Sequence, residues 1–280
     1  MLKSIEEVYY VIDEIVQHKI QKTPKKGRPS KLTMSEVITI LVEGHKRHYA
    51  TEKQVYMLIL GELRSYFKNI PCYVQFTRAV RKAMQYLDLI LEVFTQINAS
   101  KTQKFCIIDS TALPVAGYNK NHVKWALESA GIGKNMHGFY QGFKLHIIVN
   151  QNREIISATT TKANVHDVQL LKNDKFIQHV NGLLLGDKGY IASQATQNIL
   201  KKNGILLITK QRKNMDSYLN EYYKSLLQKR RHIESIFGYL KTRLGLIFPF
   251  LRSPESFITH VKAAVLAYLI RQTKPGELYV

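Results

Sequence analysis

Two aspartates occupy equivalent positions in this sequence, each next to a short apolar run. Asp109 follows FCII, and Asp187 follows LLLG in a segment that then turns toward a predicted helix. Runs of this kind predict buried strands, and functional side chains of α/β proteins gather at the carboxyl ends of strands. Either aspartate alone is equally well explained as a turn or helix-cap residue. The repeated arrangement favours a shared site.

A third acid, Glu234, lies in the predicted helical stretch KRRHIESIFGYLKTRLG. Its apolar residues fall on one helical face, and Arg230, Glu234 and Lys241 lie together along the margin of that face. A solvated helix with i,i+4 ion pairs is the simpler explanation. That explanation does not account for the surrounding charge, because residues 201–252 hold twelve Lys and Arg against three acids. Such a surface suits a phosphate backbone.

Three carboxylates carried by two strand ends and a helix can hold two Mg²⁺ ions about 3.5 to 4 Å apart. This arrangement serves in-line displacement at a phosphodiester, because hard divalent ions require anionic oxygen ligands. Nearby Arg and Lys offset the charge of a nucleic acid and of the transition state. We therefore predict that Asp109, Asp187 and Glu234 are catalytic residues and ligands of two Mg²⁺ ions, with Mn²⁺ as a substitute.

The composition of the chain favours a nucleic-acid partner. Its 280 residues carry 41 Lys and Arg against 21 Asp and Glu, a formal net charge of +20. A surplus of this size repels itself unless a polyanion shares it. Cys72 and Cys106 are too few for a disulfide scaffold or a thiolate zinc site within one chain. The apolar run 263–270 is too short to span a bilayer, so we expect a cytoplasmic protein without a membrane partner.

Residues 1–100 are predicted to form a helical DNA-binding domain. Apolar residues recur there at helical spacing, with a first helix at residues 5–20. T-x-x-E and T-x-x-Q capping boxes, which begin at Thr33 and Thr51, mark the starts of two further helices. Residues 22–31 form a basic arm without acids. A compact helical unit of this size suits a helix-turn-helix domain.

Residues 101–280 are predicted to form an α/β catalytic domain. After residue 98 the helical pattern gives way to short buried runs and to alternating strands. A hairpin first and crossovers later imply a mixed sheet with helices packed on its faces. The predicted elements, in order, are strands at 104–109, 137–150 and 153–162, a helix at 168–180, a strand at 182–187, a helix at 193–203, a strand at 204–210, and long helices.

These motifs resemble those of the DDE transposases of bacterial insertion sequences, which have an RNase H-like catalytic fold. Asp109 in IIDST matches the first acid of that family and Asp187 in LLGDKGY the second. Glu234 matches the third acid, within the signature R-x3-E-x6-K. The segment GRPSKLTMSEVITIL resembles the DNA-binding head of the insertion-sequence group numbered 982. Related groups have a Tyr three residues before the signature Arg, where this chain has Leu227.

The resemblance implies a transposase that moves DNA by cut-and-paste or a related pathway. A metal-activated water would cleave at the terminal inverted repeats of the element, and the freed 3′-hydroxyl would attack target DNA. Asp109 would bridge both metals, while Asp187 and Glu234 would each complete the shell of one. Pairing two DNA ends leads us to expect a homodimer in the synaptic complex. The predicted DNA-binding residues are Arg230, Lys241, Arg231, Lys144, Lys25, Lys26 and Arg28.

Several other residues have weaker claims to a function. Lys144 and His146 project from one side of a predicted strand; a solvated face is the simpler explanation, and contact with DNA or metals is the alternative. His166 is expected in a loop and Asp167 at a helix N-cap, with an auxiliary catalytic role as the alternative. Trp125 is expected either to pack in the core or to stack on an unpaired base.

Two other functions fit the same motifs. A nuclease of the same fold would stop at hydrolysis, but a nuclease that selects structure does not need the helical head. A DNA-binding regulator descended from a transposase would have no catalysis, and its three acids would be free to change. Since all three acids are present, strand cleavage and strand transfer are the functions we expect.

Overall fold

The computed structural model describes residues 4–19, 29–49, 51–115, 126, 128–210, 220–246, 251 and 253–273. Lys25, Lys26 and Arg28 of the predicted basic arm lie outside these ranges, as does Trp125. The chain divides into two compact units. The first, called the helical unit below, comprises Met1–Phe94, Lys124–Ala126 and Tyr239–Val280, and the second, the sheet unit, comprises Thr95–Val123 and Leu127–Gly238.

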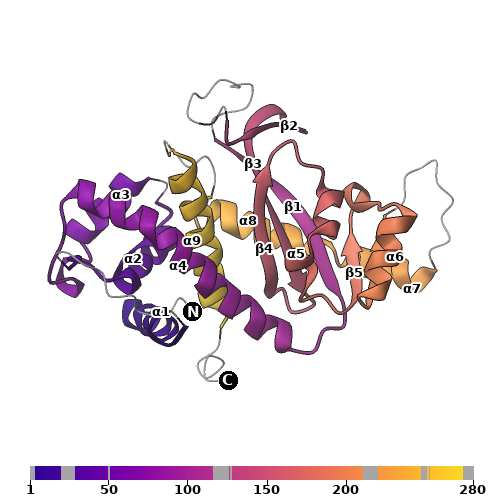
Figure 1. Cartoon of the computed structure of the whole chain (residues 1–280), viewed down its shortest axis with the longest axis horizontal. Coiled ribbons are helices and arrows are strands. Elements are labelled where there is room, and N and C mark those ends of the chain that lie inside the picture. Colours follow the sequence, from indigo (N-terminus) through magenta and orange to yellow (C-terminus); the bar gives the residue numbers. More distant parts are fainter. Residues whose placement is uncertain are drawn as a thin grey trace. The chain divides into compact units, whose positions relative to one another are not determined.

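The helical unit is organised around α2. This helix contacts α1, α3 and α9, and its residues Val37, Ile38 and Ile40 are completely buried. The helices that contribute to the unit, shown in Figure 1, are α1 (Ile5–Lys19), α2 (Met34–Lys46), α3 (Glu52–Leu60), the short η1 (Arg64–Tyr66), most of α4 (Tyr73–Ser100), the end of α8 (Arg231–Thr242) and α9 (Pro254–Gln272).

Both predicted capping boxes are confirmed. The Thr33 hydroxyl accepts a hydrogen bond from the Glu36 N–H at 3.1 Å, and the Glu36 carboxylate accepts one from the Thr33 N–H at 2.6 Å. Thr51 and Gln54 form the same reciprocal pair at the start of α3. These side chains satisfy N–H groups that the first turn of a helix leaves without a partner. Local sequence therefore fixes where α2 and α3 begin.

The apolar run 263–270 belongs to α9, and all of its residues are buried. Ser253 caps this helix by accepting a hydrogen bond from the Ser256 N–H at 3.2 Å, and Pro254 takes the first helical position. In the part of the chain that the structure describes, no helix is long and apolar enough to cross a membrane. The run instead supplies core residues of the helical unit.

Buried histidines of the helical unit hold the chain just after α8. The His45 ring donates to the Leu244 carbonyl at 2.7 Å, and the His260 ring donates to the Gly245 carbonyl at 3.3 Å. The centroids of the two imidazole rings lie 4.3 Å apart. Burial lowers the pKa of His45 to about 4, although the Leu244 carbonyl opposes this shift. Both rings therefore act as neutral donors near pH 7.

The sheet unit contains a six-stranded mixed sheet with the strand order β2-β3-β1-β5-β6, and β4 pairs with β3. Pairing is antiparallel between β1 and β3, β2 and β3, and β3 and β4, and it is parallel between β1 and β5 and between β5 and β6. The strands are β1 (Cys106–Pro114), β2 (Gly131–Asn135), β3 (Gly138–Asn150), β4 (Ile155–Lys162), β5 (Gly182–Gly186) and β6 (Ile205–Thr209).

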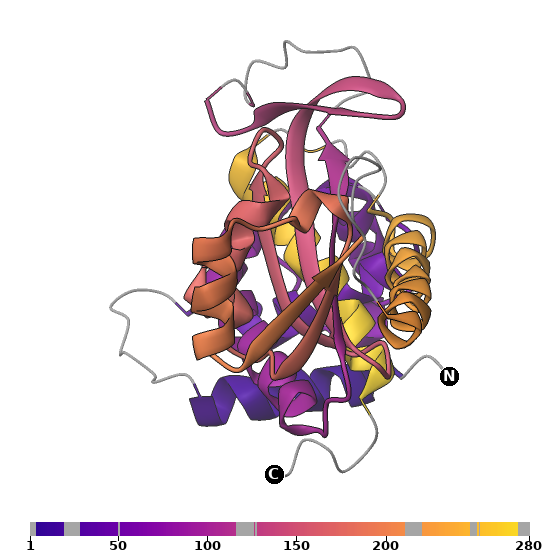
Figure 2. The same cartoon turned by 90° about the vertical axis from the view of Figure 1, so that its right-hand side faces the viewer.

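Helices flank this sheet. Figure 2 shows α6 on one side of the sheet and α8 on the other, and the hairpin of β2 and β3 extends beyond the other strands. The helix α6 contacts β6, and α7 contacts β5 and β6. The bounds of the flanking segments are η3 (Asp167–Lys172), α5 (Asp174–Ile177), η4 (Lys188–Tyr190), α6 (Gln194–Lys202) and α7 (Glu221–Gln228). The predicted α/β class, a mixed sheet flanked by helices and preceded by a helical region, is confirmed.

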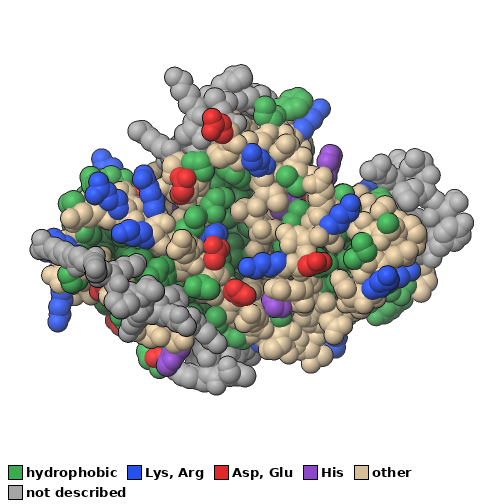
Figure 3. Space-filling model, viewed as in Figure 1, with side chains coloured by type: hydrophobic (Ala, Val, Ile, Leu, Met, Phe, Trp, Pro, Cys, Tyr) green, Lys and Arg blue, Asp and Glu red, His purple; other side chains and the backbone are tan. Residues whose placement is uncertain are grey.

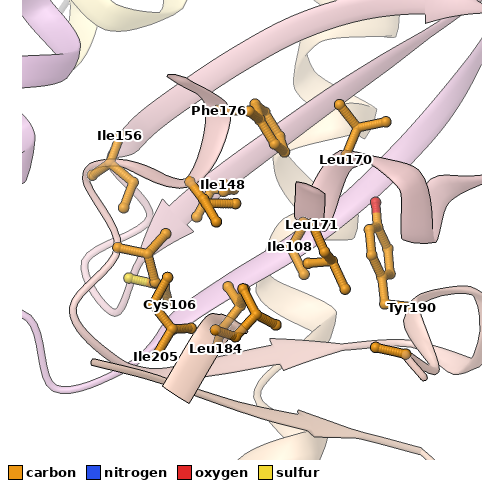
Figure 4. Packing of buried hydrophobic residues seen from close by; sticks show 14 residues of the cluster. Cys106, Ile108, Ile148, Ile156, Leu170, Leu171, Phe176, Leu184, Tyr190 and Ile205 are labelled. Carbon is orange, nitrogen blue, oxygen red and sulfur yellow. The ribbon is translucent and has the colours of Figure 1, made fainter. Parts of the chain in front are cut away.

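A core cluster lies under α5, α6 and η3. It joins Cys106 and Ile108 of β1 and Leu184 of β5 to side chains such as Leu171 and Phe176 from the short helices. Figure 4 shows these side chains packed together, with the Tyr190 ring at the edge of the cluster. Each fully buried aliphatic side chain of this kind contributes about 1.5 to 3 kcal/mol of burial free energy. The cluster therefore anchors the ends of β1 and β5 on one side of the sheet.

Three elements differ from the sequence prediction. The single helix predicted at 168–180 is two short pieces, because Asn173 interrupts it and its side chain caps α5 by accepting from the Phe176 N–H at 3.2 Å. The strand β2 was not predicted, since its GIGKN sequence lacks the usual alternation. The predicted strand ending at Asp109 continues to Pro114, because β3 pairs with β1 along its whole length.

Candidate active site

Asp109 and Asp187 lie at corresponding positions on neighbouring parallel strands. Ile107 of β1 pairs with Leu185 of β5, and each aspartate comes two residues after its member of this pair. Asp187 therefore follows the last residue of β5. Asp109 is therefore inside β1, at the point where β5 stops. The Asp187 carboxylate also accepts a hydrogen bond from the Gly189 N–H at 2.7 Å, so it caps η4, as the alternative interpretation of a strand-end aspartate predicted.

Asp109 is the most constrained carboxylate of the site. Its Oδ2 lies 2.6 Å from Nη1 of Arg230, and its Oδ1 accepts a hydrogen bond from the Ser110 N–H at 2.8 Å. Burial raises the pKa of Asp109 to about 6, and the charges of Asp187 and Asp167 raise it further, while the Ser110 N–H and Arg230 oppose the rise. A mostly buried carboxylate with other acids nearby favours a cation beside it.

Arg230 connects Asp109 to Glu234. It occupies the turn before α8, and its Nη2 lies 3.6 Å from Oε1 of Glu234. The side chain of Glu234 is 59% exposed, whereas those of Arg230 and Asp109 are 18% and 16% exposed. The guanidinium therefore bridges a buried and an exposed carboxylate that are far apart in sequence. Glu234 also lies in the first turn of α8, where the helix dipole favours a negative charge.

The remaining residues of the R-x3-E-x6-K signature region have different surroundings. Lys241 lies near the end of α8 and is partly buried, and this burial lowers its pKa. Arg231, the first residue of α8, is exposed. Leu227, which occupies the Tyr position of related groups, is buried on α7. Its place in the core explains why an apolar residue is tolerated there.

Two residues that the sequence left undecided form an ion pair. The Lys144 ammonium donates to Oδ1 of Asp167 at 2.8 Å and to the Val165 carbonyl at 2.7 Å. The two side chains are only 18% and 22% exposed. The predicted solvated face for Lys144 is therefore wrong. Asp167 is not the expected N-cap either, because His166 holds that position without a side-chain hydrogen bond and Asp167 begins η3.

His146 is a core residue rather than part of a solvated strand face. Its side chain is completely buried, and its Nε2 lies 2.8 Å from the hydroxyl oxygen of Thr161. Its ring meets the edge of Phe176 at a centroid distance of 6.4 Å. Burial lowers the pKa of His146 to about 4; the charge of Asp167 opposes this shift and that of Lys144 adds to it. A neutral, packed imidazole is the result.

The GDKGY sequence brings Asp187 and Asp167 close to one glycine. A Cβ on Gly189 would lie 3.0 Å from Oδ1 of Asp187 and 3.3 Å from Oδ2 of Asp167. Similarly, a Cβ on Gly186 would lie 3.0 Å from Cβ of Tyr190, so the absence of a side chain allows the tyrosine to fold back onto the strand end. The absence of a side chain at Gly186 and Gly189 is what makes room for this crowding.

Tyr190 places a hydroxyl group beside these acids. The residue is completely buried, and the side chain of Ser110 interacts with its hydroxyl group. Burial raises the pKa of Tyr190, and the charges of Asp167, Asp109 and Asp187 raise it further. Because three carboxylates influence one hydroxyl, they lie around a common region of the sheet unit.

Asp109, Asp187 and Glu234 carry carboxylate oxygens, the type of ligand that a hard divalent cation prefers. Within the described ranges, no three His, Cys, Asp or Glu side chains lie close enough together to hold a metal ion. In this arrangement the Arg230 guanidinium provides the positive charge between Asp109 and Glu234. The residue types fit a divalent ion, and Asp109 already holds a positive charge, the Arg230 guanidinium, 2.6 Å from its Oδ2.

The fold and the site together define an α/β protein with aspartates at corresponding positions of two neighbouring parallel strands and a glutamate at a helix start that shares Arg230 with one of them. Comparison with known protein families matches residues 99–247, more than half of the chain, to the transposase DDE domain. The chain belongs to this family of DNA-acting enzymes, which generally depend on divalent metal ions. The match includes Asp109, Asp187 and Glu234. Comparison with curated proteins gives no match.

Proposed function

We propose that the chain is the transposase of an insertion sequence of the group numbered 982, and that its catalytic domain has an RNase H-like fold. It binds the terminal inverted repeats of the element, cleaves the DNA there and transfers the freed strand to target DNA. The observation that carries this proposal is the Arg230 guanidinium, which contacts both Asp109 and Glu234 inside the segment that matches the transposase DDE domain.

Asp109, Asp187 and Glu234 are the residues we assign to two Mg²⁺ ions, or to Mn²⁺ as a substitute. Bound divalent ions would supply Lewis-acid stabilisation of the charge that develops on the phosphate during displacement. The buried Asp109 provides a fixed anionic ligand, while the exposed Glu234 can reorient on α8 at little cost. The Ser110 N–H holds the Asp109 carboxylate in place.

Arg230, Arg231 and Lys241 are the cations that we assign to DNA phosphates near the cut. Arg230 presents a planar guanidinium that can exchange a carboxylate for a phosphate, because both accept two parallel N–H bonds. Lys144 is left out of this group, since its ammonium already contacts Asp167 and the Val165 carbonyl. The exposed Arg231 needs no rearrangement to reach a ligand.

Recognition of the terminal repeats is assigned to residues 1–100, with α2 and α3 as a helix-turn-helix, and catalysis to residues 101–280. Figure 3 shows Lys and Arg side chains over α3. Clustered cations of this kind bind the phosphate backbone of DNA. Lys25, Lys26 and Arg28 would add a basic arm, and a homodimer would hold two DNA ends together. The exposed cations between α3 and the first turns of α4 are Lys53, Arg64, Lys68, Arg78, Arg81 and Lys82.

The test is a strand-transfer assay with a labelled terminal repeat, taken from the sequence that flanks the gene, in the presence of Mg²⁺. Wild type should give both cleaved and joined DNA. In each of the variants Asp109→Ala, Asp187→Ala and Glu234→Ala, the rates of formation of both products should fall by at least about a hundredfold. Asp174→Ala, an exposed acid at the start of α5, is the matched control and should remain active.

The same assay separates the alternative functions. Cleavage without joined products would identify a nuclease, and binding of the repeat without cleavage would identify a regulator. Equal activity in wild type and the three alanine variants would refute the catalytic assignment. Since Glu234 is mostly exposed, its alanine variant should keep the free energy of unfolding within about 0.5 kcal/mol of wild type, which excludes misfolding as the cause of lost activity.

A further inference from the structure

We propose that Lys144 and Asp167 form a positioning pair of the metal site, which holds a fourth acid beside Asp187 and sets how strongly that side of the site attracts a divalent cation. This inference rests on the proposed function only in treating Asp109, Asp187 and Glu234 as metal ligands. It concerns two residues outside that set, and its test measures cation binding directly.

The two oxygens of Asp167 face different partners. Oδ1 is held by the Lys144 ammonium at 2.8 Å, whereas Oδ2 faces Gly189, where it would lie 3.3 Å from an added Cβ. Asp187 faces the same glycine, with its Oδ1 3.0 Å from that Cβ position. Asp167 therefore has one oxygen fixed by a cation and one directed to the region that Asp187 occupies.

Lys144 is itself fixed in place. Its ammonium donates to the Val165 carbonyl at 2.7 Å, so it joins β3 to the loop that precedes η3. In the register of the sheet, Lys144 lies opposite Ala112 of β1 and Thr161 of β4, in the middle of the strand. Because both side chains are less than a quarter exposed, solvent screens the pair only partly. The pair is built into the sheet rather than formed on a mobile surface.

A buried hydroxyl supports the convergence of the acids independently of the ion pair. Tyr190 is completely buried, and it lies directly after Gly189, the glycine that Asp167 and Asp187 both face. The charges of Asp167, Asp109 and Asp187 all raise the pKa of Tyr190. Asp167 thus acts electrostatically on the same region as the two assigned ligands.

The two members of the pair should have opposite effects on cation binding. If Asp167 loses its charge, the Lys144 ammonium remains as an uncompensated positive charge near Asp187, so a divalent cation binds more weakly. If Lys144 loses its charge, Asp167 remains as an uncompensated negative charge, so the cation binds more tightly. A merely structural pair predicts the same direction for both changes, because either one leaves a partly buried charge without its partner.

The experiment titrates the full-length protein with Mn²⁺ and follows the free ion by electron paramagnetic resonance, without DNA. We expect Asp167→Asn to weaken Mn²⁺ binding by about tenfold and Lys144→Met to strengthen it by a similar factor. The double variant should return close to wild type. Lys172→Met and Asp174→Asn change exposed charges of η3 and α5 and should leave the affinity unchanged.

Equal or same-direction changes in the two single variants would overturn the inference. If Lys144→Met does not fold, as judged by its thermal transition, Lys144→Gln provides the same loss of charge in a more polar side chain. If wild type cleaves the terminal repeat but the two single variants do not change Mn²⁺ affinity in opposite directions, the inference is refuted and the proposed function stands. Wild-type protein that neither binds Mn²⁺ nor cleaves DNA would refute both the inference and the proposed function.

Discussion

Replacing Asp109 with asparagine should stabilise the protein while removing its activity. The carboxylate is 16% exposed, and burial raises its pKa from 3.8 to about 6 despite the opposing effect of Arg230. A raised pKa means that the folded state holds the proton more tightly than the unfolded state. The ionised form therefore costs stability at neutral pH, and an uncharged side chain of similar shape avoids this cost.

The magnitude follows from the difference between the two pKa values. A shift from 3.8 to about 6 corresponds to about 3 kcal/mol of unfolding free energy. The stability associated with neutral Asp109 is fully present below pH 3.8 and is lost as the pH rises through about 6. The gain from Asp109→Asn should accordingly approach 3 kcal/mol at pH 7 and disappear near pH 4.

Urea denaturation followed by circular dichroism checks this expectation for wild type and Asp109→Asn at pH 7 and at pH 4.5, with EDTA present. Asp174→Asn serves as a control, because this exposed acid should give no difference at either pH. Added Mg²⁺ should reduce the difference in unfolding free energy between the two proteins at pH 7, because it stabilises wild type alone. An Asp109→Asn protein that is less stable than wild type at pH 7, or a difference independent of pH, would refute the reasoning.

Two further predictions concern Gly189 and His45. Gly189→Ala places a methyl group 3.0 Å from Oδ1 of Asp187, so cleavage of the terminal repeat should fall at least tenfold while binding of the repeat, measured by gel shift, stays within about twofold. His45→Phe removes the buried donor to the Leu244 carbonyl and should lower the free energy of unfolding by about 1 to 3 kcal/mol in urea denaturation. Because the pKa of His45 is lowered to about 4, wild type should lose stability as the pH falls from 6.5 toward 4, and the phenylalanine variant should lose less.

Local signals in the sequence predicted the elements that carry the site. The capping boxes at Thr33 and Thr51 and the apolar runs before Asp109 and Asp187 depend on neighbours within a few residues. Such patterns indicate element type because they reflect hydrogen bonding and burial along one stretch of chain. The positions of the two aspartates at matching register followed from the same strand pattern.

The contacts that complete the site could not be predicted in this way. The Lys144–Asp167 pair joins β3 to η3, and the Arg230–Asp109 pair joins the turn before α8 to β1. Sequence periodicity cannot predict such a pair, because the pair depends on how distant segments of the chain pack together. Nor does any pattern within a few residues indicate that α9 packs with α2 or that the helical unit includes the C-terminal segment, because these contacts join residues far apart in the chain.

The unequal exposure of the acids has a practical consequence for studying this protein on its substrate. Asp109 is mostly buried and paired with Arg230, so a substitution there changes the stability of the folded protein. Glu234 instead extends into solvent from the start of its helix and has little role in holding the fold together. Glu234→Gln is therefore the variant of choice for trapping an arrested assembly with its DNA ends, in which the chain keeps its native architecture for crystallography or electron microscopy.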